Sequence, residues 1–542
     1  MKKWFWIFLF LTRVVSAEEE ILTCDLQSIL FVSRPSLLEN SPQITTPPVV
    51  SRDVEFLSSN PAFLETLKAY YIGTPLTRKV IREIKEQVIK FYRSENQPFA
   101  VVTVPKQDWE SGVLQVVVRE AILGELRSTG NEYYSNTHLF SYIRTKPGQP
   151  ILEEKMVEDL AWMNKNSFRR TDAIYRPGRK PGTVDLDLVT VDRWPYRVYA
   201  GADNTGTIAT ERDRIFAGFN LGKTIISDAD VSFQYTCSPN WNRFYSYTLS
   251  TRVPCFWRHE FLFYGGYAHV QPELSDSTLL EKGYSWQVDG RYRIPIMDTP
   301  DVLQTIVIGY DFKETGNQIW QNRTTTFKAV ADINQFMLGY EFGWKDIDRR
   351  INLIAEVYGN PGGITNQNRN SEYQSLRFDA KSQYAYLIIS HAFAQKMPIG
   401  AWVSYNMKGQ ISTANLLPSE QLSLTGYNAV RGFEERVLLL DNGAIFNVTI
   451  ETPHISFAKL AGSKTTVDDF YILAFFDSGL GVNHQRASGE HKFKTLGSIG
   501  PGVRYQIDRF ITARFDYGFQ LWHRGFVNPT HSRYNFGVMI SY

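Results

Sequence analysis

Cysteine is scarce in this sequence, which has three among its 542 residues: Cys24, Cys237 and Cys255. Three cysteines cannot build a disulfide scaffold, and no C-x-x-C spacing indicates zinc or redox chemistry, so we expect no metal site and no cofactor. Cys237 and Cys255 could pair across neighbouring strands in an oxidising compartment. Two unpaired buried thiols are the alternative that the sequence leaves open.

Neither sign of charge dominates the chain. The sequence has 58 basic and 56 acidic residues, a formal net charge of +2 and no long run of either sign. Proteins that bind nucleic acids gather Lys and Arg on one surface, so this balance argues against a nucleic-acid partner.

Motifs of well-known catalytic sites are also missing. The nine histidines are scattered, and there is neither a G-x-S-x-G nor an H-E-x-x-H sequence, so no hydrolase residues can be recognised. The stretch GSIGPG from Gly497 has no following lysine, which argues against a phosphate-binding loop. We therefore predict no catalytic residues, and no nucleotide motif is visible.

The N-terminus carries the one long apolar run. Lys2 and Lys3 precede the apolar residues from Trp4 to Leu11, and the segment VSA ends at Ala17. This pattern predicts a secretory signal peptide, residues 1–17, with cleavage after Ala17. The run is too short for a membrane-spanning helix, which needs about 20 apolar residues, and no other segment reaches that length.

Aromatic residues, in contrast, are abundant. They make up 14% of the chain, while the mean hydropathy of −0.27 is mildly hydrophilic. This combination suits a membrane β-barrel, which has an aromatic outer face and a polar lumen. A soluble all-β protein is also compatible with it.

The first part of the chain mixes helix and strand patterns. The stretch TRKVIREIKEQVIKFY has the apolar spacing of an amphipathic helix, and it begins at Thr77, a residue type that caps helices. Strand patterns follow at Phe99 and Gly112, and from Gly124 the same order recurs. Two copies of a small β-α-α-β-β unit fit this order.

Domain boundaries follow from these patterns. We place an N-terminal segment with the first α+β unit at 18–120, the second unit at 121–193 and an all-β region at 194–542. The Pro- and Ser-rich residues 35–60 are interpreted as a loop or flexible insertion.

The region after residue 194 alternates apolar and polar residues over spans of about ten residues. In ITARFDYGFQLW, Phe515, Tyr517 and Phe519 share the apolar face, and Arg514 and Asp516 point the other way. A soluble sandwich would give the same alternation. The aromatic content and the export signal favour an outer-membrane barrel, in which this region allows about sixteen strands.

The chain also stops on an alternating strand, YNFGVMISY, whose last residue is the aromatic Tyr542. Outer-membrane barrels typically end in this way, and their assembly machinery reads that end of the chain. We therefore predict that Tyr542 belongs to a C-terminal assembly signal.

Several long stretches resemble the TpsB transporters of two-partner secretion, the hemolysin/hemagglutinin secretion-activation porter family. The matching stretches are VPKQDWESGVLQVVVREAILGEL, MNKNSFRRTDAIYRPGRKPGTVDLDLVTVDR and YRVYAGADNTGT. The resemblance covers nearly the whole chain after the signal peptide and is weakest at 35–60. It implies a membrane all-β fold, a sixteen-stranded transmembrane β-barrel preceded by two small α+β POTRA domains.

The family carries two motifs that can be placed on this sequence. V-R-G-aromatic, in a long loop that folds back into the lumen, stands here as Val430, Arg431, Gly432 and Phe433. F-x-D-x-G, on a later barrel strand, stands as Phe475, Asp477 and Gly479.

The strand pattern gives independent support to the second motif. Residues 470, 472, 474, 476 and 480 are apolar and share one face, so Asp477 looks into the lumen on the other face. A carboxylate there is stabilised by a guanidinium that binds it bidentately, and Arg431 is the expected partner. By spacing alone, Arg431 would be interpreted as a solvated loop arginine. The second RGF, from Arg524, is interpreted as loop residues before the last strand.

The resemblance implies an outer-membrane porter that exports an unfolded TpsA-type exoprotein, with its POTRA domains in the periplasm. Folding of the exoprotein at the cell surface would drive export. Further partners implied are outer-membrane lipids and the barrel-assembly machinery. Two alternatives remain: a barrel insertase of the same superfamily, and an outer-membrane enzyme of the lipase or protease type.

Overall fold

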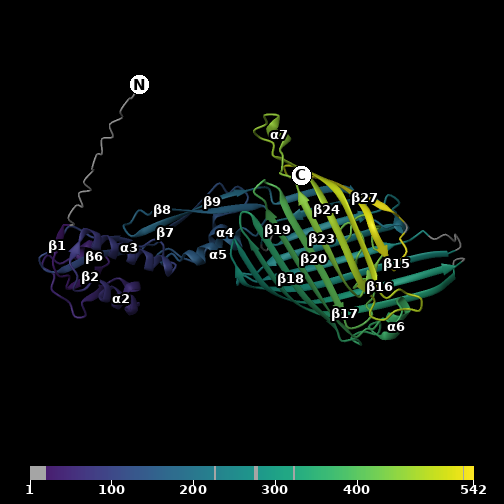
Figure 1. Cartoon of the computed structure of the whole chain (residues 1–542), viewed down its shortest axis with the longest axis horizontal. Coiled ribbons are helices and arrows are strands. Elements are labelled where there is room, and N and C mark those ends of the chain that lie inside the picture. Colours follow the sequence, from purple (N-terminus) through teal and green to yellow (C-terminus); the bar gives the residue numbers. More distant parts are fainter. Residues whose placement is uncertain (1–19, 225–227, 274–278, 322–323, 529) are drawn as a thin grey trace, which may run out of the picture. The chain divides into compact units, whose positions relative to one another are not determined.

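The computed structural model describes residues 20–224, 228–273, 279–321, 324–528 and 530–542. Two compact units make up this chain (Figure 1). The first unit holds the residues up to Met163 together with Thr171–Val191, and the second holds Asn164–Arg170 and Asp192–Tyr542. The predicted signal peptide, residues 1–17, lies outside the described residues.

The first unit contains two α+β domains. The elements of the first domain are β1 (Ile21–Thr23), β2 (Ser28–Val32), β3 (Val49–Arg52), α1 (Glu55–Ser58), α2 (Pro61–Tyr71), β4 (Leu76–Thr77), α3 (Arg78–Ser94), β5 (Val101–Thr103) and β6 (Val113–Arg119). Those of the second are β7 (Ile122–Thr129), α4 (Asn136–Ser141), α5 (Glu153–Met163), β8 (Arg169–Pro177) and β9 (Thr183–Asp192). The sheet orders are β3-β2-β6-β5 and β7-β9-β8.

Helix α3 is the amphipathic helix that the sequence predicts. The Thr77 hydroxyl accepts a hydrogen bond from the backbone N–H of Val80, which satisfies one of the free donors of the first turn. The apolar face, with Ile84, Val88 and Tyr92, is buried against the sheet. Burial, and then the hydrogen bond from its hydroxyl to Glu120, raise the pKa of Tyr92 well above its ordinary value.

The interpretation of residues 35–60 as a loop or insertion is wrong in part. Strand β3 pairs in parallel with β2, and α1 buries Leu57 in the core of the domain. The residues VVSR of β3 form a strand of four residues, only two of them apolar, next to two prolines, so the Pro- and Ser-rich surroundings concealed it. A 3-10 turn at Pro35–Leu37 is the only regular element between β2 and β3 in the described chain.

In the second unit, sixteen strands of the described residues close into an antiparallel barrel, because β10 pairs with both β11 and β27. The strands are β10 (Tyr196–Asp203), β11 (Arg214–Leu221), β12 (Asp230–Cys237), β13 (Phe244–Pro254), β14 (Glu260–Val270), β15 (Leu279–Asp298), β16 (Val302–Gln321), β17 (Thr324–Lys345), β18 (Arg349–Asn360), β19 (Tyr384–Lys396), β20 (Trp402–Ser412), β23 (Asn442–Glu451), β24 (Asp468–Val482), β25 (Lys494–Ile507), β26 (Ile511–Arg524) and β27 (Ser532–Ser541). The expectation of a sixteen-stranded barrel is confirmed.

Short elements lie in the barrel's connections. They are a 3-10 turn (Ile208–Thr210), α6 (Asn370–Leu376), β21 (Leu422–Ser423), β22 (Leu439–Leu440) and α7 (Phe457–Leu460). No helix within the described ranges is long and apolar enough to cross a membrane.

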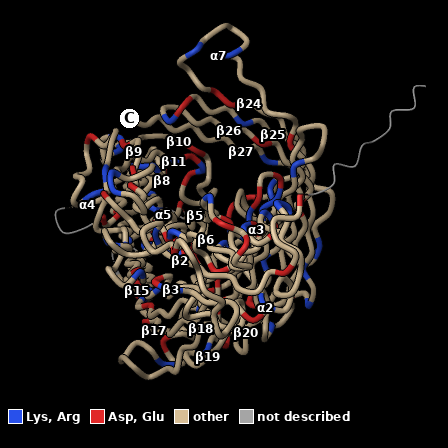
Figure 2. Tube along the Cα trace, turned by 90° about the vertical axis from the view of Figure 1, so that its left-hand side faces the viewer, with Lys and Arg blue, Asp and Glu red and all other residues tan. Residues whose placement is uncertain are grey.

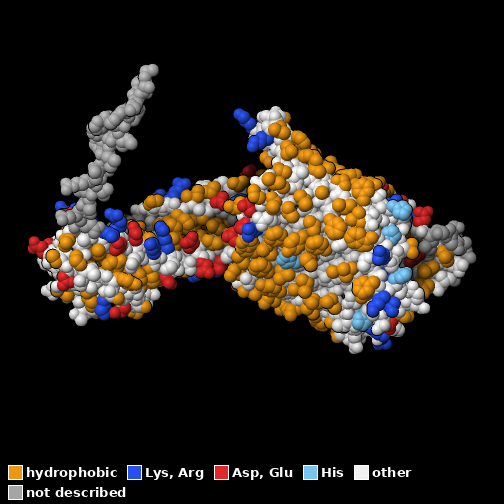
Figure 3. All heavy atoms as spheres, in the orientation of Figure 1, with side chains coloured by type: hydrophobic (Ala, Val, Ile, Leu, Met, Phe, Trp, Pro, Cys, Tyr) orange, Lys and Arg blue, Asp and Glu red, His pale blue; other side chains and the backbone are white. Residues whose placement is uncertain are grey.

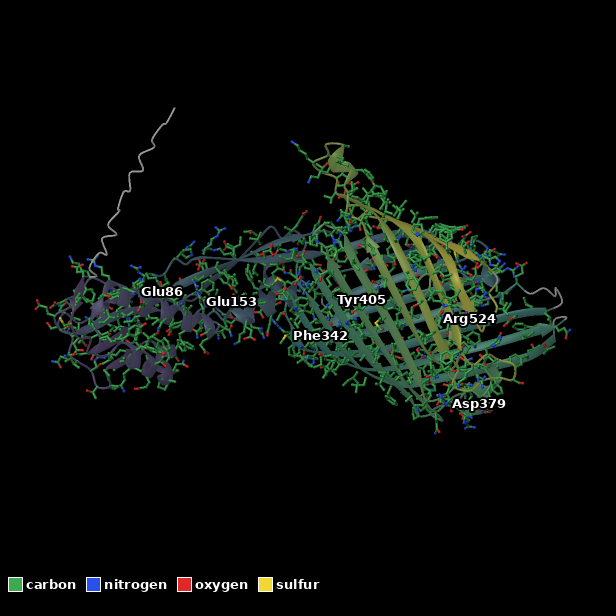
Figure 4. The ribbon with its side chains drawn as sticks, viewed as in Figure 1. Glu86, Glu153, Phe342, Asp379, Tyr405 and Arg524 are labelled. Carbon is green, nitrogen blue, oxygen red and sulfur yellow. The ribbon has the colours of Figure 1, made fainter. Side chains whose placement is uncertain are left out.

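We call the end of the barrel where β10 begins and β27 ends the base, and the other end the loop end. The labelled residues Asp379 and Arg524 both lie at the loop end (Figure 4). Alternation along the strands gives the barrel an apolar outer surface, which Figure 3 shows as a broad hydrophobic area. In β26, Phe515 and Phe519 are exposed on this surface while Asp516 is buried inside.

The disulfide between Cys237 and Cys255 is not formed, and both thiols are free. Cys237 lies opposite Tyr245 at the loop end of β13, whereas Cys255 follows Pro254 at the base end of the same strand. The ten residues from Tyr245 to Cys255 span roughly 30 Å at about 3.3 Å per residue, and a disulfide needs Cα atoms within about 7 Å. The two cysteines do lie on adjacent elements, but at opposite ends.

A thiol titration checks this result. The purified protein, unfolded without reductant, is expected to report three reactive thiols, one for each cysteine in the sequence. A value of one thiol, rising to three after reduction, would contradict the structure.

Candidate functional site

Residues 413–441 connect β20 to β23 at the loop end and fold back inside the barrel. We call this segment the lumen loop. Its neck is closed by pairing of β21 with β22. Beyond the neck, apolar side chains of the loop form a cluster with the inward residues Ile445 and Leu496 of the barrel wall. The cluster includes Leu424, Val430 and Phe433, all of them fully buried.

Arg431 and Asp477 are in direct contact. The guanidinium donates from Nε to Oδ2 of Asp477 at 2.7 Å and from Nη2 to Oδ1 at 2.8 Å, which is the bidentate arrangement. The backbone N–H of Arg431 donates to the same Oδ2 at 3.1 Å. Asp477 is fully buried, so three hydrogen bonds replace the water that this carboxylate has lost.

The other two residues of the F-x-D-x-G motif shape the pocket around this pair. The guanidinium carbon of Arg431 lies 3.6 Å from the ring centroid of Phe475, a cation–π contact. A Cβ atom on Gly479 would lie 3.2 Å from Cγ2 of Val430 and 3.0 Å from Leu496, so glycine at this position leaves room for the loop valine. Each motif residue on the strand therefore contacts or accommodates a residue of the loop.

Two constraints favour glycine at position 432. Its φ of +88° lies in the left-handed region, and a Cβ atom there would lie 2.9 Å from the backbone oxygen of Gly518 in β26. In addition, Gln520 Nε2 donates to the Gly432 carbonyl at 2.7 Å. The loop backbone thus rests directly on the backbone of the wall.

Phe433 fills a buried position next to the second RGF sequence. Its ring centroid lies 6.3 Å from that of Phe526 and 6.5 Å from that of His523. Phe526 packs against the apolar cluster of the lumen loop. Gly525 and Phe526 lie in the loop before β27, as predicted, whereas Arg524 is the last residue of β26. Phe526 also contacts the V-R-G-F motif, which the sequence interpretation did not foresee.

A second charge pair balances the first. Asp516 of β26 lies 3.5 Å from Nη1 of Arg431 and 2.9 Å from Nη2 of Arg504. Two arginines and two aspartates therefore form one network with no net charge. This neutrality matters because an unpaired buried charge is strongly destabilising.

Glu434, which the sequence interpretation missed, anchors the loop to another part of the wall. Its carboxylate accepts hydrogen bonds from Arg212 at 2.8 Å and 3.1 Å, and it also pairs with Arg533 of β27. Arg533 in turn donates to the carbonyl oxygens of Asn204 and Gly206, after β10. Glu434 therefore connects the loop to the seam where the first and last strands meet.

Glu420 provides a third anchor. It accepts hydrogen bonds from Lys313 Nζ at 2.9 Å, from Gln335 at 2.9 Å and from the Tyr386 hydroxyl at 2.8 Å. These partners come from β16, β17 and β19. The loop is thus held on separate sectors of the barrel wall.

Weak sequence signals for Glu420 and Glu434 exist. Each is an acidic residue within or beside apolar stretches of a segment predicted to enter the lumen. Spacing cannot separate Glu434 from its neighbour Glu435, whose carboxylate instead accepts a hydrogen bond from the backbone N–H of Tyr427. Their partners are separated from them by long stretches of sequence, so only the folded barrel identifies them.

Tyr542 lies at the base and is 71% exposed. Its backbone pairs with Val198 of β10 in both directions, at 2.9 Å and 3.0 Å. Val538 and Ile540, on the same face of β27, are also exposed. The last residues of the described chain therefore present an apolar and aromatic face on the outside of the barrel.

The charged groups of the site hold the lumen loop against the barrel wall. Glu420, Arg431 and Glu434 of the loop are each paired with an opposite charge of the barrel, and no group of three or more His, Cys, Asp or Glu in the described part of the chain could hold a metal ion. The geometry fixes the position of a segment that occupies the lumen.

Comparisons with known proteins agree with this architecture. The family model described as "Haemolysin secretion/activation protein ShlB/FhaC/HecB" matches residues 182–505. The chain is 19% identical to the heme/hemopexin transporter protein HuxB of Haemophilus influenzae (strain 86-028NP), over 80% of this chain and 76% of that protein. It is 17% identical to the outer membrane transporter CdiB of Dickeya dadantii (strain 3937), over 85% and 80%. The solved structure of CdiB from Escherichia coli matches with a TM-score of 0.76 at 16% identity, over 98% of this chain and 93% of that one.

Replacement of Gly432 tests how closely the loop rests on the wall. Gly432→Ala adds left-handed strain of about 1–2 kcal/mol and a clash with Gly518, so we expect the lumen loop to detach more often. Trypsin added from the loop end should cleave the lumen loop at least about tenfold faster, which corresponds to about 1.4 kcal/mol.

Gly489, in the connection between β24 and β25 and outside the lumen loop, provides a control for backbone strain alone. It has a φ of +82° but open space around its Cβ position, so Gly489→Ala adds strain without the clash. Equal cleavage rates in the two variants would mean that the contact with Gly518 does not hold the loop.

Proposed function

Because this chain belongs to the haemolysin secretion/activation protein family ShlB/FhaC/HecB, we propose that it exports an unfolded partner exoprotein through its barrel. The family is one of two-partner secretion transporters and not of enzymes. The chain lies in the outer membrane, with its POTRA domains in the periplasm. The base of the barrel is therefore the periplasmic end, and the loop end faces the outside.

The observation that carries this proposal is the lumen loop with its buried pair of Arg431 and Asp477. A general diffusion pore needs neither a loop fastened at several sectors nor two preceding domains. A porter for a polypeptide needs a barrier that is closed at rest and that can move. In the proposed cycle, the loop releases from Asp477 when the exoprotein enters and returns after its passage.

The POTRA domains would bind the exoprotein before it enters the barrel. Strand β8 is an edge strand of the sheet β7-β9-β8 and is nine residues long, and the other edge strands of the two sheets have eight residues in β7, four in β3 and three in β5. An extended polypeptide can add to such an edge through backbone hydrogen bonds, with little demand on its sequence. Ile174, on β8, is 44% exposed and offers an apolar contact beside this edge.

Two further partners belong to the same proposal. The apolar outer surface would contact outer-membrane lipids, as in other transmembrane barrels. The barrel-assembly machinery would recognise the apolar face of β27 that includes Tyr542 during insertion.

A comparison of exported proteins tests the function. We expect deletion of the gene from its host to remove one or a few large proteins from the surface and the medium, while other outer-membrane barrels stay at their normal level. A general fall of outer-membrane barrels would instead identify an insertase and overturn the proposal.

Complementation with variants of the lumen loop connects the function to the site. Arg431→Ala is expected to lower export at least about tenfold, because removing one partner of a buried ion pair costs about 3–5 kcal/mol and frees the loop. The barrel should still assemble, since the strand ladder is unchanged. Arg436→Ala, at an exposed arginine of the same loop whose guanidinium donates, among the described residues, only to the Pro418 carbonyl of the loop itself, is the matched control and should export normally. Equal loss of folded barrel in the Arg431 variant would contradict this.

Photocrosslinking tests the edge strand. A benzoylphenylalanine at position 174 is expected to crosslink to the exoprotein during export, whereas one at Tyr70, an exposed residue on helix α2, should not. The crosslinked product should vanish when the exoprotein identified by the deletion experiment is absent. Equal crosslinking at both positions would argue against strand addition at β8.

A further inference from the structure

The connection between β23 and β24, residues 452–467, is unusual among the turns at the base. The other base connections range from three residues, as at 508–510, to eight at 222–229, whereas this one has sixteen. Periplasmic turns of outer-membrane barrels are characteristically short. We call residues 452–467 the α7 hairpin.

The α7 hairpin is an ordered structure built on the outer wall. Ile455 pairs with Phe470 of β24 through two backbone hydrogen bonds of 2.9 Å. The carboxylate of Asp468 accepts hydrogen bonds from the backbone N–H groups of Phe457 and Ala458, at 3.0 Å each, which fixes the start of α7. The ring of Phe457 packs 4.9 Å from that of Phe470.

These contacts hold the hairpin beside the lipid-facing side of the barrel. Phe470 shares its face of β24 with Ile472, which is exposed on the outer surface. In the view of Figure 1, and in the end-on view of Figure 2, α7 stands outside the outline of the neighbouring strands β24 to β26. The hairpin therefore extends outward at the periplasmic end of the wall, where the headgroups of the inner leaflet lie.

The exposed side chains of the hairpin combine apolar and cationic groups. Leu460 is 75% exposed and Val467 is 70% exposed. Lys459 directly precedes Leu460, Lys464 lies three residues before Val467, and residues 452–467 include no Asp or Glu. Figures 2 and 3 show this basic character at the tip of the hairpin. The acidic groups beside the hairpin are engaged. Asp468 binds the start of α7, Glu451 and Asp469 contact His454, and Asp508 accepts a hydrogen bond from the backbone N–H of Val467.

We propose that the α7 hairpin is a lipid-binding element that lies in the headgroup region of the periplasmic leaflet. Leu460 and Val467 reach toward the acyl chains, and Lys459 and Lys464 pair with phospholipid phosphates. This combination of apolar side chains and cations is the one by which interfacial segments bind anionic lipid surfaces. The long lysine stems allow the ammonium groups to reach phosphates while the neighbouring apolar side chains are buried. This binding does not depend on export.

Spin labelling of the full-length protein measures the depth of the hairpin. In a background with Cys24→Ser, Cys237→Ser and Cys255→Ser, a nitroxide is attached through Leu460→Cys and the protein is reconstituted into vesicles of phosphatidylethanolamine and phosphatidylglycerol. We measure the collision rate of the nitroxide with oxygen and its collision rate with a water-soluble nickel complex. We expect the ratio of the first rate to the second to be higher than for a label in water, as it is for labels within lipid.

Two control labels calibrate the ratio. Ile472→Cys, on the outer surface of β24, gives the value for a lipid-exposed site, and Tyr70→Cys, on helix α2, gives the value for an aqueous site. Combining Leu460→Cys with Lys459→Glu and Lys464→Glu should move the ratio toward the aqueous value in these anionic vesicles.

Two outcomes would overturn the proposal. One is a Leu460 label with the same ratio as the Tyr70 label in the vesicles. The other is a label that is aqueous in vesicles but protected in native membranes, which would mean that a protein covers the hairpin. A variant that loses export while its Leu460 label stays at lipid depth would support lipid binding by the α7 hairpin, because the loss of export then bears only on the proposed porter function.

Discussion

The buried ion pair between Arg431 and Asp477 determines where the lumen loop lies. Burying a carboxylate without a partner would be strongly unfavourable, so Asp477 is stable at its position only while the guanidinium chelates it. The arginine in turn needs Phe475 beneath it and a glycine after it, and the strand needs a glycine at 479. The two short motifs are thus the two halves of one contact.

Two further carboxylates, Glu434 and Glu420, fasten the lumen loop to other parts of the barrel wall. Glu434 joins the loop to Arg212 and Arg533 at the seam, and Glu420 joins it to Lys313 on another sector. A loop that left Asp477 would withdraw the carboxylate that faces the two seam arginines. Movement of the loop is therefore coupled to the charge balance of the seam between β10 and β27.

Local patterns in the sequence were enough to predict the strands, whereas the contact between Arg431 and Asp477 was predicted from the resemblance to the transporter family, because spacing alone favours a solvated Arg431. Alternation identified the barrel, and the capping residue Thr77 marked the start of α3. Longer-range geometry could not be predicted in this way. The separation of Cys237 from Cys255 depends on which end of β13 each occupies, and the contact of Phe433 with Phe526 depends on the registers of β24 to β27. Strand β3 was missed because a four-residue strand gives too short a pattern.

The most direct test of the central claim is whether Arg431 and Asp477 act as one unit. Export and barrel folding would be measured for Arg431→Ala, Asp477→Asn and the double variant. If the two residues form one contact, each single variant and the double variant lose export to nearly the same extent, with the barrel folded in all three. A double variant whose loss equals the product of the two single losses would show that the residues act independently, and would contradict this account.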